Sequence, residues 1–151
     1  MTTPTHSPTT LYDHVGGQPA FDRLAAAWYP LVLQDPLLQP MFGEGRPEHI
    51  PHMSALLAEV FGGPARFTRE LGGFQALLKP HRGRQIQEVQ RKRFVELFMR
   101  AADDAEWPTD SRTRLALREY LEFGTRVAVH NSIVTSDVDL DPCQEIPRWN
   151  W

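Results

Sequence analysis

The sequence has one cysteine, Cys143, and no long apolar run. A single cysteine excludes an intramolecular disulfide and a cysteine-rich metal knuckle, and it fits a reducing compartment. A membrane span needs about 20 predominantly apolar residues, and the polar first ten residues lack the charged start and apolar core of a secretory signal. We therefore expect a cytoplasmic protein with no membrane segment.

The sequence also has no excess of basic over acidic residues. The chain carries 16 Lys and Arg against 19 Asp and Glu, a net charge of −3, whereas a general nucleic-acid binder needs a basic field to attract phosphates. It contains no internal repeat, no glycine-rich phosphate loop and no alternating apolar and polar run that would predict strands. A length of 151 residues suits a single domain. We therefore expect an all-α domain with no nucleic-acid partner.

Three segments differ in composition. Residues 1–10 form a polar lead that we expect to be disordered, residues 11–133 carry the helical pattern of one domain, and residues 134–151 form an acidic, proline-containing tail. The tail ends in two tryptophans, Trp149 and Trp151. The sequence leaves open whether they fold back onto the domain or form a subunit contact.

Apolar residues at three-to-four spacing predict the helices. Pro30 lies inside the first of them and predicts a kink or an early end just after Tyr29. The second ends at Gly62-Gly63-Pro64 and begins at either Pro47 or Pro51. A short helix runs from Phe74 to His81, a long one runs from about Glu88 to near Trp107, and the last begins at Asp110 or Ser111.

Histidines are the main candidates for chemistry, because no serine or cysteine stands in a pattern typical of a nucleophile. The six are His6, His14, His49, His52, His81 and His130. The spacing of His49 and His52 would let a helix present both to one metal ion, but this pattern has no accompanying carboxylate and is a weak signal.

His81 shares a predicted helical face with Phe74, Leu77 and Leu78. A buried imidazole needs a partner for each nitrogen, because an unpaired buried polar group costs about 1–3 kcal/mol. A metal on one nitrogen and a helix carbonyl on the other would satisfy both. Periodicity alone favours a simpler interpretation, in which the histidine faces solvent or caps the helix end.

Several stretches, taken in order, resemble the truncated haemoglobins, most closely the bacterial group II branch. They are LYDHVGGQPAFDRL from Leu11, AEVFGGP from Ala58, LLKPHRGRQI from Leu77, QRKRFVELFMRAADDA from Gln90, LEFGTRVAVHNS from Leu121 and the closing PRWNW. The order and spacing of these stretches carry the resemblance. It implies a truncated globin, a two-over-two helical sandwich around one haem b.

The resemblance also implies roles for individual residues. His81 matches the proximal ligand of the haem iron, and Tyr29 matches the distal tyrosine that donates to bound oxygen. Phe42 matches the aromatic residue on the porphyrin face, and His49 and Met53 match distal positions one turn apart. The haem-contact residues implied in this way are His81, Phe42, Met53, Leu56, Phe67, Leu77, Lys79, Arg84, Ile86 and Phe94.

Two positions depart from the family pattern. Phe94 stands where group II members usually carry a tryptophan that donates a second hydrogen bond to the ligand, so oxygen would depend on Tyr29 and His49. Pro80 replaces a frequent arginine beside the proximal histidine. Lys79, Arg82 or Arg84 would then meet a haem propionate instead.

The implied function is reversible binding of O2, NO or CO at five-coordinate ferrous iron, in a monomer or homodimer. Tight oxygen binding would favour redox work, either NO oxidation or peroxide turnover, supported by an unidentified reductase. The alternatives are a haem-based sensor acting through a separate partner and a haem-free helical interaction module. The sequence leaves open whether His49 or Tyr29 closes the sixth iron position when no ligand is bound.

Overall fold

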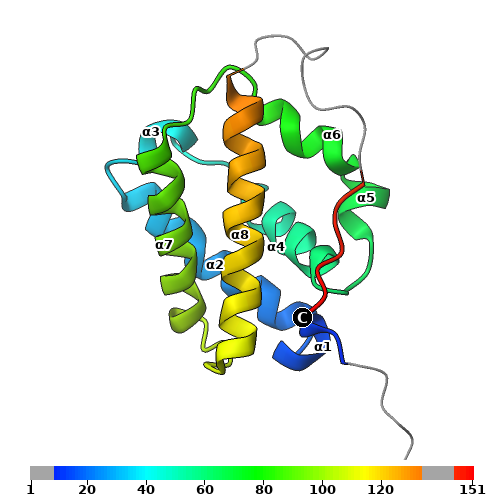
Figure 1. The fold of residues 1–151 in the computed structure, drawn as a ribbon. Coiled ribbons are helices and arrows are strands. Elements are labelled where there is room, and N and C mark those ends of the chain that lie inside the picture. Colours follow the sequence, from blue (N-terminus) through cyan, green and yellow to red (C-terminus); the bar gives the residue numbers. More distant parts are fainter. Residues whose placement is uncertain (1–8, 134–144) are drawn as a thin grey trace, which may run out of the picture.

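The structure, a computed structural model, describes residues 9–133 and 145–151, and every regular element in this part of the chain is helical (Figure 1). The expected all-α fold is confirmed. Residues 1–8 and 134–144, which include His6, Cys143, most of the expected lead and much of the expected tail, lie outside the described residues. The elements are α1 Leu11–Val15, α2 Gln18–Gln34, α3 Gln39–Phe42, α4 His49–Val60, α5 Arg66–Glu70, α6 Gly73–Leu78, the 3₁₀ turn η1 Lys79–His81, α7 Glu88–Asp104 and α8 Ser111–Ser132.

Helix starts follow from local capping. Thr10 accepts the Asp13 N–H at 3.1 Å and begins α1, while Asp110 accepts the Thr113 N–H at 3.0 Å and begins α8. Side-chain oxygens at these positions satisfy amides that have no partner inside the helix. Of the two starts that the sequence offered for the last helix, Asp110 is therefore the N-cap.

Pro30 does not end α2, so the prediction of an early end after Tyr29 is wrong. A proline removes one helical hydrogen bond and leaves the carbonyl four residues earlier without its partner. That carbonyl belongs to Ala26, which is exposed and can bind water, as is Pro30 itself. The helix instead ends at Gln34, and the carboxylate of the C-cap residue Asp35 accepts the N–H groups of Leu37 and Leu38, both at 3.2 Å.

Two other helix boundaries differ from expectation. α4 begins at His49, so neither Pro47 nor Pro51 is its first residue. The helix expected to run from Phe74 to His81 ends as an α-helix at Leu78, and His81 lies in the tighter turn η1. Proline at position 80 cannot donate to the α-helical ladder, and it lies in this turn.

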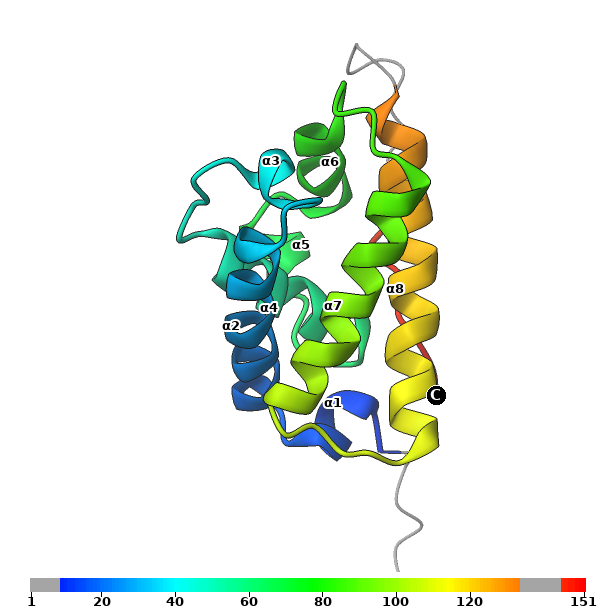
Figure 2. The ribbon, with the colours of Figure 1, turned by 90° about the vertical axis from the view of Figure 1, so that its left-hand side faces the viewer.

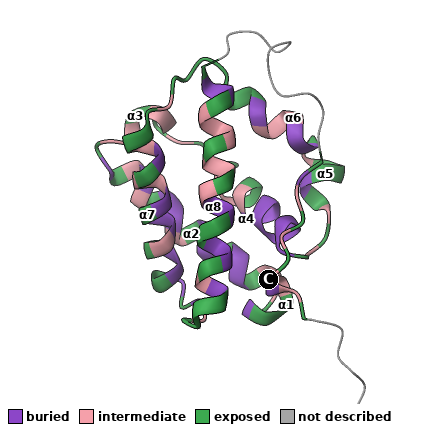
Figure 3. Ribbon diagram, viewed as in Figure 1, coloured by how far each residue is buried: buried purple, intermediate pink, exposed green. Residues whose placement is uncertain are grey.

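The long helices form two packed pairs. α2 packs against α4 and α7, and α7 packs against α8, so that one pair crosses the other (Figures 1 and 2). α3, α6, the start of α7 and the end of α8 lie at one end of the molecule, and α1 lies at the other. Buried residues gather on the inward faces of these helices (Figure 3). No described helix is long and apolar enough to cross a membrane.

The last seven residues return to the domain beside α1, so the structure shows the tail tryptophans folded back (Figure 1). The Trp149 N–H donates to the Val60 carbonyl at 2.7 Å, and the Trp149 ring lies 5.4 Å from Tyr120 and 5.5 Å from Phe123. Trp151 Nε1–H donates to the Thr9 carbonyl at 2.7 Å. These contacts tie the C-terminal segment to α4, α8 and the chain start.

Candidate functional site

His81 lies at the end of η1, directly after the buried Phe74 and Leu78 of α6. The residue as a whole is half-buried, but its Nδ1 atom is fully buried and has no hydrogen-bond partner among the described residues. Burial lowers the pKa of the His81 imidazole. The Leu77 carbonyl faces the ring and partly opposes this shift. The Nδ1 atom nevertheless makes no hydrogen bond of normal geometry to that carbonyl. A neutral ring is the form that can bind a metal ion.

Tyr29 lies on α2 with its hydroxyl between two partners. The Arg46 backbone N–H donates to Tyr29 Oη at 2.7 Å, and His49 Nδ1 lies 2.5 Å from the same oxygen. Tyr29 is 5% exposed. The hydroxyl is therefore enclosed, and both its partners come from the segment that leads into α4.

Gly45 makes this approach of the chain to Tyr29 feasible. Its φ is +83°, a left-handed conformation that side chains other than glycine adopt at a cost, and a Cβ there would lie 2.7 Å from Tyr29 Oη. Neither Gly45 nor the Arg46 amide stands in a sequence pattern that predicts a site. No sequence pattern identifies a backbone donor whose partner lies 17 residues away.

His49 is the first residue of α4 and is half-buried. Burial lowers the pKa of His49 below its ordinary value, and the charges of Arg46, His52 and Arg84 act in the same direction against Glu48. His52 is exposed, and the described residues contain no cluster of three or more histidine, cysteine or acidic side chains placed to hold a metal ion. The weak two-histidine metal pattern has no further ligands around it.

Aromatic rings surround Tyr29. The Phe42 ring lies 6.3 Å from Tyr29 and 5.7 Å from His49. Trp28, whose helical spacing from Phe21 and Leu24 predicts a buried position, lies 6.1 Å from Phe42 and 5.8 Å from Phe94. Its Nε1 atom is buried and has no hydrogen-bond partner among the described residues. Periodicity predicted that Trp28 is buried, but it could not predict that its donor is unpaired.

The remaining expected haem-contact residues lie along the same elements. Leu56 and Phe67 are buried, Met53, Leu77, Ile86 and Phe94 are half-buried, and Lys79 and Arg84 are exposed. Arg84 lies near both histidines. Its Nη1 donates to the Met41 carbonyl at 3.4 Å, and its charge lowers the pKa of both His81 and His49. The structure thus brings Tyr29, Phe42 and His49 into contact, and Arg84 donates to the carbonyls of Pro80 and Met41, the chain neighbours of His81 and Phe42.

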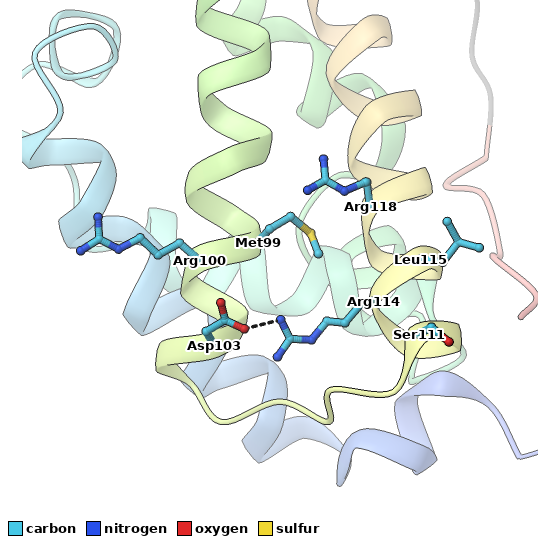
Figure 4. Close-up of a pocket in the computed structure, with 7 residues that line it drawn as sticks. All are labelled: Met99, Arg100, Asp103, Ser111, Arg114, Leu115 and Arg118. Atoms are coloured by element: carbon cyan, nitrogen blue, oxygen red, sulfur yellow. Dashed lines mark hydrogen bonds and ion pairs between the residues drawn. The ribbon is translucent and has the colours of Figure 1, made fainter.

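A shallow hollow on the outer face of α7 and α8 is a poorer candidate (Figure 4). Arg114 forms an ion pair with Asp103 across it at 2.6 Å, and the exposed side chain of Leu115 points away from its floor. The hollow is open to solvent and contains no histidine or cysteine. The chemistry therefore points to the region of His81 and Tyr29.

A family profile described as bacterial-like globin matches residues 10–127. The chain is a bacterial-like globin. A haemoglobin from the actinobacterium Thermobifida fusca is 30% identical to this globin, with a TM-score of 0.69 over 80% of this chain and 97% of the other. The group II truncated haemoglobin from Bacillus anthracis is 22% identical, with a TM-score of 0.73 over 85% of this chain and 94% of the other, a likeness of fold alone. The two-over-two truncated fold expected from the sequence is confirmed, and bacterial group II structures share it.

Relatives that match by sequence include members of another branch. A group 1 truncated haemoglobin from Nostoc commune is 33% identical to this globin over 81 residues, which are 53% of this chain and 64% of that protein. The match thus spans less than two thirds of the relative. Membership of the family implies a haem cofactor and small diatomic ligands. It does not identify the residues of this chain that bind them.

Proposed function

We propose that this globin holds one haem b through His81 Nε2 and binds O2, CO or NO reversibly between Tyr29 and Phe42. The observation that carries the proposal is the state of the two His81 nitrogens. Nδ1 is buried facing the Leu77 carbonyl, and no described residue bonds to Nε2. A ligating histidine typically donates one ring N–H to a carbonyl and binds the metal with the other nitrogen.

The residues around this histidine fit a flat apolar macrocycle with an anionic edge. Phe42, Met53, Leu56, Phe67, Leu77, Ile86 and Phe94 offer apolar side chains that would exclude water, at about 25 cal/mol for each Å² of apolar surface buried. Lys79 and Arg84 are exposed beside His81 and would pair with the propionates. When bound, the haem supplies an iron whose sixth position takes a diatomic ligand.

Tyr29 supplies the polar group on the distal side. A donated hydrogen bond to a ligand that carries partial negative charge contributes about 1.5–3 kcal/mol, enough to slow its release tenfold or more. Slow release suits redox work, such as NO oxidation or peroxide turnover with a separate electron donor, better than oxygen delivery. We expect the Tyr29→Phe variant to release O2 at least tenfold faster, and an unchanged release rate would contradict this assignment.

The test of the haem site is an absorption spectrum of the purified protein in its ferric, reduced and carbon monoxide states. We expect a Soret band that shifts when carbon monoxide is added. The His81→Gly variant should lose the pigment and regain it with added imidazole, while the exposed His52→Ala variant should behave as wild type. A colourless protein that takes up no haemin would overturn the proposal and favour a haem-free interaction module.

A further inference from the structure

The Tyr29 hydroxyl has more potential partners than it has protons. A phenol carries one O–H donor and accepts through its oxygen. The Arg46 backbone N–H is a fixed donor to that oxygen at 2.7 Å, so it uses an acceptor site and leaves the phenol proton unassigned. His49 Nδ1 at 2.5 Å can either receive this proton or donate its own. The direction of the Tyr29–His49 bond therefore decides where the phenol proton points.

We propose that His49 is a positioning residue that decides whether the Tyr29 hydroxyl donates to a diatomic ligand or to the imidazole. When Nδ1 carries no proton, it accepts the Tyr29 proton and competes with the ligand. When Nδ1 carries a proton, it donates to Tyr29 Oη together with the Arg46 amide. The Tyr29 proton is then free for the ligand. The inference rests on the proposed function, and it assigns to His49 a role through Tyr29 instead of a direct bond to the ligand.

The surroundings of His49 favour the neutral ring near pH 7. Its own helix and the preceding loop contribute Glu48, Arg46 and His52, and Arg84 faces it from the segment after η1. The positive groups outweigh the single carboxylate, and burial adds to their effect. A neutral imidazole with its proton on Nε2 leaves Nδ1 as an acceptor. At neutral pH the hydroxyl of Tyr29 is accordingly shared with His49, and acidification releases it.

The predicted pH trend is unusual in sign. As the pH falls through the pKa of His49, the O2 dissociation rate should decrease, by about tenfold, because the ligand gains the whole Tyr29 donor. A histidine that bonded directly to the ligand would give the opposite result, since protonation would draw it toward water. The C–O stretching frequency of the carbon monoxide complex should fall over the same pH range, because a donor near the ligand oxygen weakens that bond.

The decisive variants separate His49 from Tyr29 in the full-length protein loaded with haem. His49→Ala removes the competing acceptor, so O2 release at pH 8 should become about tenfold slower than in wild type and lose its pH dependence. Tyr29→Phe should release O2 quickly at every pH. His52→Ala removes one of the charges that lower the pKa of His49, so it should keep the pH dependence and move its midpoint slightly upward.

Ring nitrogen chemical shifts of His49 in the carbon monoxide complex provide a readout that does not depend on ligand release. We expect the proton on Nε2 at pH 8 and on both nitrogens after acidification. Faster O2 release in His49→Ala, or a wild-type rate that rises on acidification, would overturn the inference while leaving the haem proposal intact. A protein that forms no carbon monoxide complex would instead contradict the proposed function and this inference together.

Discussion

The two ends of the molecule treat buried polar atoms differently. Beside α1, Trp107 Nε1–H donates to the Ala20 carbonyl at 2.9 Å. Arg148 Nη1 donates to the carbonyls of Glu59 at 2.9 Å and Gly63 at 2.7 Å. At the other end, beside α3 and α6, lie the buried side-chain nitrogens that have no partner among the described residues, Trp28 Nε1 and His81 Nδ1.

This difference indicates that the α1 end of the domain contributes mainly to stability and the His81 end mainly to function. Folded proteins pair nearly all their buried polar groups, because an unpaired group costs about 1–3 kcal/mol. The end with α1 follows this rule, so its contacts stabilise the fold. The end with His81 departs from it, and unpaired buried atoms of this kind are typical of functional sites, where stability is given up for function.

The largest expected effect tests this separation directly. Trp149→Ala removes a ring packed on Tyr120 and Phe123 and should lower the free energy of unfolding by about 3 kcal/mol, while the carbon monoxide spectrum of the folded protein stays unchanged. His81→Ala should do the reverse, with loss of haem uptake but a cost of under about 1 kcal/mol without haem, because it removes an unpaired atom. Urea unfolding and haem titration measure the two quantities.

The control for the first variant is Asn150→Ala, an exposed neighbour that should be neutral in both measurements. If Trp149→Ala changes the carbon monoxide spectrum as well as the free energy of unfolding, the two ends are not independent.

Two tryptophans allow a matched comparison of the paired and unpaired indole. Trp107→Phe removes the indole donor to the Ala20 carbonyl together with part of the ring and should lower the free energy of unfolding by about 2 kcal/mol. Trp28→Phe removes a donor that has no partner, so only the lost ring volume counts and the cost should be about 1 kcal/mol. Equal losses in urea unfolding would show that Trp28 Nε1 has a partner of its own.

A glycine pair isolates the contact with Tyr29. Gly45 and Gly43 both have positive φ, +83° and +59°, so alanine at either position should cost about 1 kcal/mol in backbone strain. Only at Gly45 would the new Cβ also meet Tyr29 Oη, whereas at Gly43 it would meet nothing within 4 Å. Gly45→Ala should therefore be the less stable variant and should change the O2 release rate, which Gly43→Ala should leave alone.

The sequence predicted much of the fold because the fold depends on patterns that are local. Asp110 and the Gly62-Gly63-Pro64 stop were identified by capping and helix-ending rules, and both mark real helix ends. Pro30 misled because the effect of a proline depends on whether water can reach the freed carbonyl, which is a property of the folded surface. The return of residues 145–151 onto α4 depends on partners about 90 residues away and has no local signal.

The candidate site was predictable in its residues but not in its bonds. Resemblance to the truncated haemoglobins supplied Tyr29 and His49 as distal positions, and the structure places them 2.5 Å apart. That distance depends on Gly45 and on the Arg46 amide, which come from a loop whose path the sequence does not specify. A list of site residues therefore names the donors, while only the fold decides which acceptor each donor meets.

The smallest expected effect concerns the pH dependence of the free energy of unfolding, which should differ between the two ends of the molecule. The Thr113 N–H, with its hydroxyl and His14, lowers the pKa of Asp110 to about 2 at the α1 end. A carboxyl whose pKa is depressed on folding stabilises the protein above its unfolded pKa, and this contribution is lost as the pH falls toward the folded value. At the site end burial lowers the pKa of His49, with His81 shifted in the same direction. Below about pH 6.5 these two histidines therefore bind more protons in the unfolded chain than in the folded protein. The free energy of unfolding decreases as the pH falls through this range.

Urea unfolding of haem-free protein should thus show two separate losses, one beginning near neutral pH and one below about pH 4. His49→Ala should reduce the first slope and leave the second, whereas Asp110→Asn should reduce the second and leave the first. If His49→Ala leaves the slope between pH 7 and pH 5 unchanged, its imidazole is not held neutral by the fold. The release of the Tyr29 hydroxyl to a ligand would then occur near the ordinary histidine pKa of about 6.5 and not below it.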